Sequence, residues 1–225
     1  MDSSSLEKNI GVIFKNKNFL KEALTHRSYL NENPSWGQHN ERLEFLGDSV
    51  LELITSVFLY EKYPDRNEGD LTMLRAALIN YQMLASVSRE IDLENYILLS
   101  KGEAKDTGKG REAILADAFE ALLAAVYLDQ GYEVAENFVR KFLLPHLEEI
   151  EKKQLYRDPK SLLQEIIQEQ SRITPTYQVL EESGPDHQKI FRVGVYAGEK
   201  LIAEGKGLSK QEAETNAASQ ALASL

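Results

Sequence analysis

The chain has 225 residues, of which 42% are apolar and 28% charged, and it contains no cysteine. This composition excludes a disordered or collagen-like chain. The lack of thiols excludes a disulfide framework, a thiolate metal site and a cysteine nucleophile. The length allows one large domain, or a medium domain with a small companion. The sequence shows neither a signal peptide nor an apolar run approaching the ~20 residues that cross a bilayer, so we expect a cytoplasmic protein without a membrane partner.

The net charge is −10, from 26 Lys and Arg against 36 Asp and Glu. An acidic chain is at first sight a poor partner for nucleic acid, because affinity for the phosphate backbone comes mostly from Lys and Arg. Concentrated carboxylates can, however, hold divalent cations that bridge to phosphates. The charge therefore leaves a nucleic-acid partner open.

Apolar residues recur at helical spacing through most of the first part of the chain. The segments with this spacing are 20–24, 42–63, 71–91 and 113–128, and a further amphipathic helix ends near Pro145. Turn-forming residues break the pattern at 31–35, 63–65, 100–111 and 130–131. We therefore predict an all-α domain over residues 1–150.

The chain turns charged over 148–157, which is typical of a linker or of the frayed end of a helix, and we assign 151–157 as the linker. Asp158-Pro159 then suits the start of a helix, because proline is favoured at the first helical position. After a helix at 160–170, the segments 176–180, 190–196 and 201–205 alternate as strands do. A last helix runs from Ser209, a good N-cap, to Leu225. Residues 158–225 are therefore predicted to form a small α+β domain of order α-β-β-β-α.

Three acids, Glu41, Glu44 and Asp48, fall within an arc of about 60° around one predicted helix. The apolar residues of this helix occupy a separate arc and form a predicted core stripe of Leu43, Leu46, Val50, Leu53, Ile54 and Val57. The acids are either a solvated helix face or part of a functional cluster.

A second acidic pair, Asp117 and Glu120, lies in segment 113–128, which is otherwise apolar on every side. Such a helix is buried, and buried carboxylates need cations beside them, which this segment does not supply. Carboxylates converging from two helices suit Mg²⁺ or Mn²⁺. We therefore favour a metal site over the alternative of a hydrogen-bonded structural pair.

One segment, His39-Asn40-Glu41-Arg42-Leu43-Glu44-Phe45-Leu46-Gly47-Asp48-Ser49, resembles the signature of bacterial ribonuclease III. Supporting matches stand in the order of that family at 23–29, 68–72 and 115–121. The tail is similar to a double-stranded-RNA-binding domain at 158–165, 184–187 and 205–210. Together these motifs cover nearly the whole chain.

The resemblance implies a homodimeric, Mg²⁺-dependent endonuclease in which Mn²⁺ can substitute. It would cut double-stranded RNA to 5′-phosphate and 3′-hydroxyl ends with short 3′ overhangs, in the processing of rRNA precursors and mRNA. By motif position, the metal ligands would be Glu44, Asp48, Asp117 and Glu120. Asp48 and Glu120 would be the most critical for cleavage, and Glu41 and Glu68 would be further acids at the cleavage site.

The alternative is a non-cleaving double-stranded-RNA-binding dimer. Such a protein would be expected to have lost at least one of the four metal-binding acids, and none is missing.

On spacing alone, Phe45 is either an exposed aromatic residue or a subunit anchor, and the resemblance implies that it inserts into the partner subunit. His26 is favoured as a structural residue over a general base. The Gly- and Lys-rich segment 100–111 is favoured as a mobile solvated loop over an RNA contact.

In the tail, recognition of A-form RNA depends on minor grooves and phosphates. Gln164 and Glu165 would reach one minor groove, and Pro185 and His187 the next. The residues suited to the intervening phosphates are Lys206, Ser209 and Lys210. Gln211 replaces the second of two adjacent lysines usual in the family, and residues 158–225 hold 7 Lys and Arg against 10 Asp and Glu. We therefore expect a weak grip on phosphate.

Overall fold

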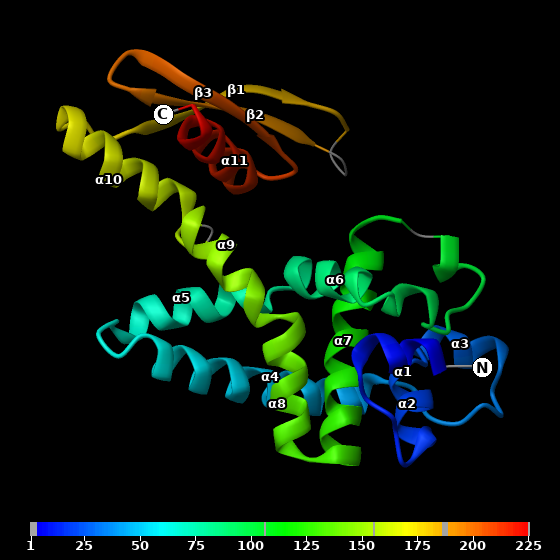
Figure 1. Ribbon diagram of the computed structural model, residues 1–225. Helices are drawn as coiled ribbons and strands as arrows, with labels where there is room; N and C mark the ends of the chain where they lie inside the picture. The colour runs from blue at the N-terminus through cyan, green and yellow to red at the C-terminus, as the bar shows by residue number, and fades with distance from the viewer. Residues whose placement is uncertain (1–3, 106, 155, 186–188, 225) are drawn as a thin grey trace. The chain divides into compact units, whose positions relative to one another are not determined.

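The computed structural model describes residues 4–105, 107–154, 156–185 and 189–224, without the side chain of Lys109. The chain divides into two compact units, Met1–Tyr156 and Arg157–Leu225 (Figure 1). None of the helices in these described ranges combines the length and the apolar character needed to cross a membrane.

The first unit is helical, as predicted. Its α-helices are α1 (Ser4–Ile10), α2 (Lys17–Ala23), α3 (Arg27–Glu32), α4 (Glu41–Lys62), α5 (Glu68–Ile79), α6 (Tyr81–Glu90), α7 (Lys109–Gln130), α8 (Tyr132–Phe142) and α9 (Leu147–Lys152). Short 3-10 turns lie at Leu93–Asn95, Glu103–Lys105 and Leu144–His146. In the described part of this unit, β pairing is limited to one isolated bridge between Thr25 and Leu98.

Two boundaries of this unit differ from the sequence pattern. The helical spacing over 71–91 belongs to two helices, because Asn80 ends α5 and caps α6: its Oδ1 accepts from the N–H of Met83 at 2.9 Å. The predicted linker, 151–157, begins inside α9, where Glu151 accepts hydrogen bonds from Tyr63 and Arg66. The ordered helical unit therefore reaches further along the chain than the charge pattern indicated.

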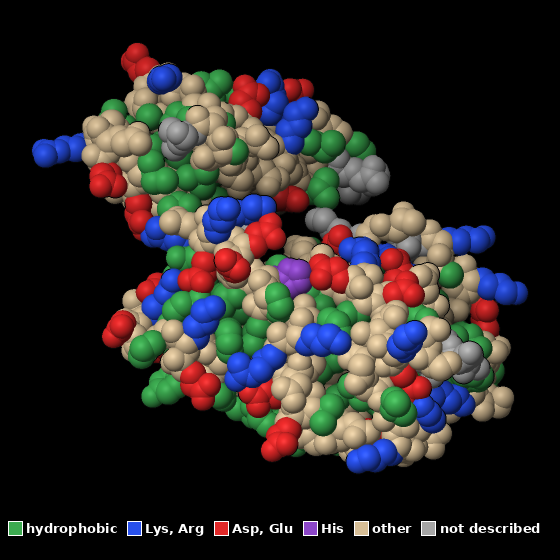
Figure 2. All heavy atoms as spheres, viewed as in Figure 1, with side chains coloured by type: hydrophobic (Ala, Val, Ile, Leu, Met, Phe, Trp, Pro, Cys, Tyr) green, Lys and Arg blue, Asp and Glu red, His purple; other side chains and the backbone are tan. Residues whose placement is uncertain are grey.

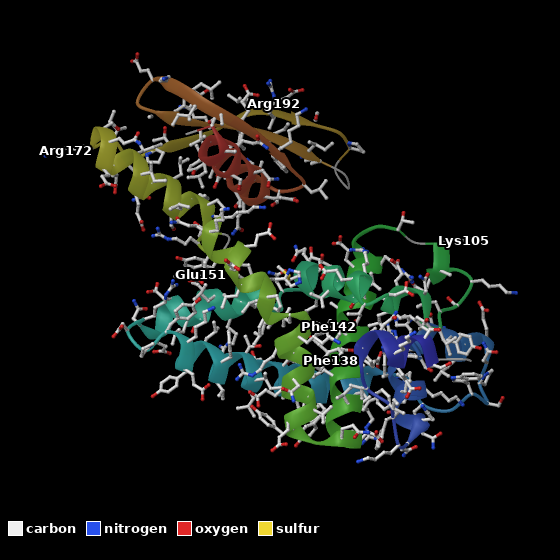
Figure 3. The ribbon with its side chains drawn as sticks, in the orientation of Figure 1. Lys105, Phe138, Phe142, Glu151, Arg172 and Arg192 are labelled. Carbon is white, nitrogen blue, oxygen red and sulfur yellow. The ribbon has the colours of Figure 1, made fainter. Side chains whose placement is uncertain are left out.

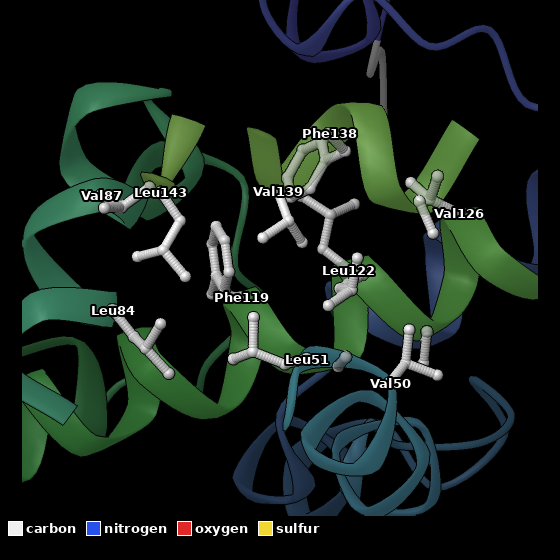
Figure 4. Packing of buried hydrophobic residues seen from close by; sticks show 14 of the residues in the cluster. Val50, Leu51, Leu84, Val87, Phe119, Leu122, Val126, Phe138, Val139 and Leu143 are labelled. Atoms are coloured by element: carbon white, nitrogen blue, oxygen red, sulfur yellow. The ribbon is translucent and has the colours of Figure 1, made fainter. Parts of the chain in front are cut away.

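Helix α7 forms the centre of the first unit and packs against α4, α6, α8 and α2 (Figure 1). Phe119 of α7 is fully buried, and its ring centroid lies 5.5 Å from that of Phe138. Figure 4 shows Phe119 among Leu51, Leu84 and Leu143, which come from other helices and from the turn after α8. The burial of α7 on nearly every side explains why its segment is apolar all round.

The second unit consists of α10 (Pro159–Ser171), β1 (Thr176–Ser183), β2 (Ile190–Ala197), β3 (Lys200–Gly207) and α11 (Lys210–Ala223). The strands form an antiparallel sheet of order β1-β2-β3, and a small core joins Val195 of the sheet to Leu163 of α10 and Ala217 of α11. Asp158 and Ser209 cap the two helices, since their side chains accept from the N–H groups of Ser161 and Glu212. The predicted α-β-β-β-α order is therefore confirmed.

Candidate functional site

A close backbone approach between α4 and α7 creates the candidate site. An ideal Cβ placed on Gly47 would lie 1.9 Å from the carbonyl oxygen of Glu120 and 2.4 Å from its carbonyl carbon. Only glycine therefore lets the two helices meet at this point. The residues beside the contact, Glu44 and Asp48 on α4, consequently face the same region as Asp117 and Glu120 on α7.

These four residues, which we call the acid cluster, influence one another's protonation. Burial, followed by Asp48 and the other two acids, raises the pKa of Glu120 to about 8. Burial, and then Asp117 among the charges, raises the pKa of Glu44. The pKa of Asp117 is also raised, mainly by burial and to a smaller extent by Glu41. The fold thus brings the two separate acidic patterns of the sequence into one electrostatic group.

No described residue forms an ion pair or a hydrogen bond with a carboxylate of the acid cluster. Carboxylate oxygens that lack a cationic neighbour are a donor set that suits a hard divalent cation. Among the described residues, however, no three such side chains are already arranged as a group that could hold a metal ion. The metal assignment for Glu44, Asp48, Asp117 and Glu120 therefore stays a prediction.

A cavity of about 460 Å³ opens beside the cluster. Its lining residues are His26, Arg27, Asn40, Glu41, Glu44 and Asp117. The guanidinium of Arg27 lies 3.3 Å from a carboxylate oxygen of Glu41, so Glu41 joins the edge of the acidic region with a cation beside it. Arg27 and Asn40 were not among the predicted site residues; only their place in motifs that resemble the family could have indicated them.

Glu68 does not join these acids within one chain. It is exposed at the start of α5 and lines a separate cavity of about 740 Å³ that also includes Tyr60, Tyr63 and Arg66. Phe45 is 79% exposed on α4, and Tyr60, further along the same helix, is 74% exposed. Glu68 thus lines a different cavity from the acid cluster, whereas Phe45 follows Glu44 on α4 with its side chain exposed.

The prediction of which α4 residues face the core is partly wrong. Leu43, Val50 and Ile54 are buried, but Leu53 and Val57 are exposed to 53% and 36%. Leu53 lies at the edge of the stripe and Val57 within it, and helical spacing alone does not show how far the covering helices extend along α4. The exposed side of α4 is thus more apolar than predicted.

The residues predicted to bind RNA in the second unit are exposed wherever the structure describes them. Gln164 and Glu165 lie on α10, and Pro185 follows β1. Lys206 is the next-to-last residue of β3, Ser209 is the N-cap of α11 and Lys210 is its first residue. His187 lies outside the described residues.

Two of these residues have an ionic partner within the unit that the sequence did not reveal. Glu165 lies 2.5 Å from Arg157, and Lys210 lies 3.1 Å from Glu182. Arg192 of β2 (Figure 3) is likewise paired with Glu181 and Glu204. On the face that Figure 2 shows, Lys and Arg side chains stand among Asp and Glu side chains. Acidic residues of this chain therefore already form ion pairs with some of the Lys and Arg side chains that could otherwise contact phosphates.

Comparison with known families matches both units. Residues 16–147 match the family described as Ribonuclease-III-like, and residues 159–225 match the Double-stranded RNA binding motif. Ribonuclease 3 of Borreliella afzelii is 45% identical over 219 residues, which cover 97% of this chain and 89% of that protein. Ribonuclease 3 of Streptococcus agalactiae is 45% identical over 223 residues, which cover 99% of this chain and 97% of that protein.

The solved nuclease domain of ribonuclease III from Campylobacter jejuni superposes with a TM-score of 0.59 at 38% identity. The match covers 64% of this chain and 99% of that domain. The helical unit with its converging acids, the α-β-β-β-α unit and these full-length relatives agree with one another. The chain is therefore a member of the ribonuclease III family of endoribonucleases, with a helical nuclease domain followed by a double-stranded-RNA-binding motif.

Proposed function

We propose that this protein is a Mg²⁺-dependent, homodimeric endonuclease that cleaves double-stranded RNA to 5′-phosphate and 3′-hydroxyl ends with short 3′ overhangs. Its substrates would be rRNA precursors and mRNA, and the lack of cysteine favours a reducing compartment such as the cytoplasm. The observation that carries the proposal is the convergence of four half-buried or exposed carboxylates at the contact between α4 and α7. In the described part of the chain, none of the four is paired with a cation.

The residue types suit phosphodiester hydrolysis. That reaction needs an activated water, in-line attack and neutralisation of the charge on the scissile phosphate and the leaving oxygen. Mg²⁺ or Mn²⁺, when bound, supplies charge neutralisation and water activation. Glu44, Asp48, Asp117 and Glu120 would hold the ion. Glu41 would engage RNA or water at the edge of the site, and the same proposal for Glu68 rests on the resemblance alone.

A long RNA duplex, incubated with Mg²⁺ and separately with EDTA, tests the proposal on a denaturing gel. We expect short fragments only with Mg²⁺, and no cleavage of a single strand of the same sequence. Fragments whose 5′ ends a kinase labels only after phosphatase treatment carry a terminal 5′-phosphate. Retention of the duplex without fragments would instead support the non-cleaving double-stranded-RNA-binding dimer.

In the second unit, the ion pair between Lys210 and Glu182 provides a test of the RNA-binding surface. Glu182→Gln should free Lys210 for a phosphate and tighten duplex binding about 2- to 5-fold at moderate salt, the range expected for an exposed ion pair. The slope of log affinity against log salt should steepen by about one, as for one added phosphate contact. Both quantities can be measured by fluorescence anisotropy at several salt concentrations.

Glu181→Gln is the matched control for this experiment. It removes the same charge from the neighbouring residue of β1, but Glu181 is paired with Arg192, and adjacent strand residues point to opposite faces of the sheet. Equal effects of the two substitutions would mean that general charge, rather than release of Lys210, controls the affinity.

For the dimer, Phe45 and the cavity at Tyr60 are complementary features at the two ends of one helix. They are separated by about 22 Å along α4 at the usual helical rise. A two-fold axis across the middle of the helix would place Phe45 of each copy against the cavity of the other. In the Campylobacter jejuni nuclease domain, a flexible region is involved in dimer formation. We therefore infer an isologous dimer through the exposed face of α4.

Phe45→Glu should weaken this dimer by about 100-fold or more, because a charged side chain would have to leave water and enter a cavity that Leu59 and Leu71 line in part. Sedimentation equilibrium at micromolar concentration measures the effect. Ile13→Glu is the control, since Ile13 is 78% exposed, almost the same as Phe45, but lies outside α4. If Phe45→Glu were as dimeric as the control, Phe45 would be an ordinary exposed aromatic residue and not a dimer contact.

A further inference from the structure

The imidazole of His26 is held in one tautomer at the wall of the acidic cavity. His26 is the N-cap of α3, and its Nδ1 accepts from the backbone N–H of Ser28 at 3.3 Å. A backbone N–H can only donate, so Nδ1 carries no proton and the neutral ring carries its proton on Nε2. The hydroxyl of Ser28, 2.8 Å from the same Nδ1, adds a second contact that is compatible with this tautomer.

The surrounding backbone fixes the position of the ring. The N–H of His26 donates to the carbonyl of Leu98 at 3.1 Å, and the N–H of Ser100 donates to the Ser28 hydroxyl at 3.0 Å. The segment that starts at Ser100, which the sequence favoured as a solvated loop, is thus tied at its first residue to α3. Burial lowers the pKa of His26, with Arg27 and His39 acting in the same direction and Glu103 and Glu41 opposing them.

The Nε2–H of His26 has no acceptor among the described residues. His26 lines the cavity of the acid cluster and also a neighbouring cavity of about 580 Å³. Asn40 lines the first cavity too; it is only 1% exposed, and its Nδ2 has no hydrogen-bond partner in the described part of the chain. A buried donor such as the Asn40 amide is normally satisfied, so this partnerless N–H group calls for an acceptor from a ligand, and the Nε2–H of the half-exposed His26 offers a second donor in the same cavity.

The cavity combines these donors with charges of both signs. Besides His26 and Asn40 it contains the guanidinium of Arg27, and the acids Glu41, Glu44 and Asp117 complete its lining. A phosphodiester oxygen accepts hydrogen bonds but cannot donate, so it fits two neutral N–H groups beside an arginine. The acids would repel the same group unless a cation lay between them.

We propose that His26 and Asn40 bind a non-bridging phosphate oxygen of the RNA strand held at the acid cluster. This inference rests on the proposed function, because it takes RNA as the ligand. His26 then acts as a neutral hydrogen-bond donor that positions the strand, and it transfers no proton.

The substitution His26→Asn distinguishes the proposed role of His26 in substrate binding from its role as the N-cap of α3. Asparagine is among the best N-cap residues, so its side-chain oxygen can replace Nδ1, but the shorter side chain removes the Nε2–H. The melting temperature should stay within about 2 °C of the wild type. The value of kcat/KM for duplex cleavage should fall about 10- to 100-fold, the effect of losing one hydrogen bond to a charged group. His146→Asn, which removes a histidine elsewhere in the same unit, should cleave like the wild type.

Asn40→Ala tests the second donor. The side chain of Asn40 makes no hydrogen bond with a described residue, so its removal takes away no polar contact that holds the fold. A fall in kcat/KM similar to that of His26→Asn is expected. Normal cleavage by both variants would overturn the proposal.

The pH profile distinguishes a neutral donor from an acid or base. The ratio of the wild-type rate to the His26→Asn rate should stay constant between pH 7 and pH 9, since the N–H donor does not titrate there. A ratio that changes with pH would overturn the proposal in favour of proton transfer by His26.

Histidine ¹⁵N spectra give a readout that does not depend on cleavage. With Glu120→Gln as a slow-cleaving background, the Nε2 signal of His26, assigned by its absence in the His26→Asn double variant, should shift when a short duplex is added. An unmoved signal with bound duplex would overturn the proposal even if His26→Asn were unstable. If the wild type itself cleaved no duplex, the proposed function would fail separately.

Discussion

Glu120→Gln is expected to lower duplex cleavage at saturating Mg²⁺ by about 100-fold or more, because the charge stabilisation that a bound metal supplies is worth several kcal/mol. The substitution keeps the shape of the side chain and removes only the charge that would hold the cation. Duplex binding should persist, since the second unit is unchanged and one fewer negative charge favours phosphate. Single-turnover cleavage and duplex affinity, measured on one preparation, give both numbers.

The same variant should alter the pH dependence of stability in EDTA. The raised pKa of Glu120, about 8, lies above that of an unfolded glutamate, so the folded state binds this proton more tightly than the unfolded state does. The stability contributed by Glu120 is therefore complete below pH ~4.5 and is lost as pH rises towards 8. Glu120→Gln should match the wild type in acid and exceed it in melting temperature near pH 8.

Addition of Mg²⁺ at pH 8 should raise the melting temperature of the wild type more than that of Glu120→Gln, because only the wild type keeps all four acids. Glu112→Gln, on the same helix, is the control and should respond to Mg²⁺ like the wild type. Near-normal cleavage by Glu120→Gln would contradict the assignment of Glu120 as a metal ligand. A collapse of stability would instead identify a structural residue and favour the binding-only alternative.

The sequence singles out residues of the candidate site most clearly where one helix carries the information. Asp117 and Glu120 stand out because α7 is buried on nearly all sides, and a charged side chain in the middle of a buried helix requires a compensating partner. Glu44 and Asp48 are ordinary in a helix that has a polar face. Their connection to α7 was inferred from the metal chemistry of carboxylates and assigned residue by residue from the resemblance, because helical spacing shows which face a residue occupies and not which other helix that face meets.

Features that depend on side-chain partners were not predictable in the same way. Glu182 and Lys210 are far apart in sequence, and only the fold of the second unit brings their charges within 3.1 Å. The break at Asn80 was missed because asparagine can occur inside a helix, and its side chain caps α6 only once α5 and α6 separate. Leu53 had the spacing of a core residue but lies where α4 is uncovered.

Gly47 lies within the segment that resembles the family signature, yet the physical reason for a glycine appears only in the structure. Its contact with the backbone of Glu120 joins two helices that the sequence keeps far apart. The distance between Glu44 and Asp48 on one side and Glu120 on the other therefore depends on this one missing side chain. A change at Gly47 should affect stability and cleavage together.

Gly47→Ala should destabilise the protein by about 2 kcal/mol or more. The alanine Cβ would lie 1.9 Å from the Glu120 carbonyl oxygen, and a backbone atom in a packed helix cannot move aside as a side chain can. Overpacking of this kind costs roughly 3 kcal/mol, which exceeds the gain of about 1 kcal/mol from replacing glycine within a helix. Urea unfolding measures the difference.

Gly102→Ala is the control for Gly47→Ala, because the nearest atom to its added Cβ would be a serine hydroxyl oxygen at an ordinary 3.8 Å. Cleavage by any folded Gly47→Ala protein should also be lower, since separation of α4 from α7 moves Glu44 and Asp48 away from Glu120. A Gly47→Ala variant as stable and active as Gly102→Ala would show that the two helices can part without cost. The acid cluster would then not depend on their contact.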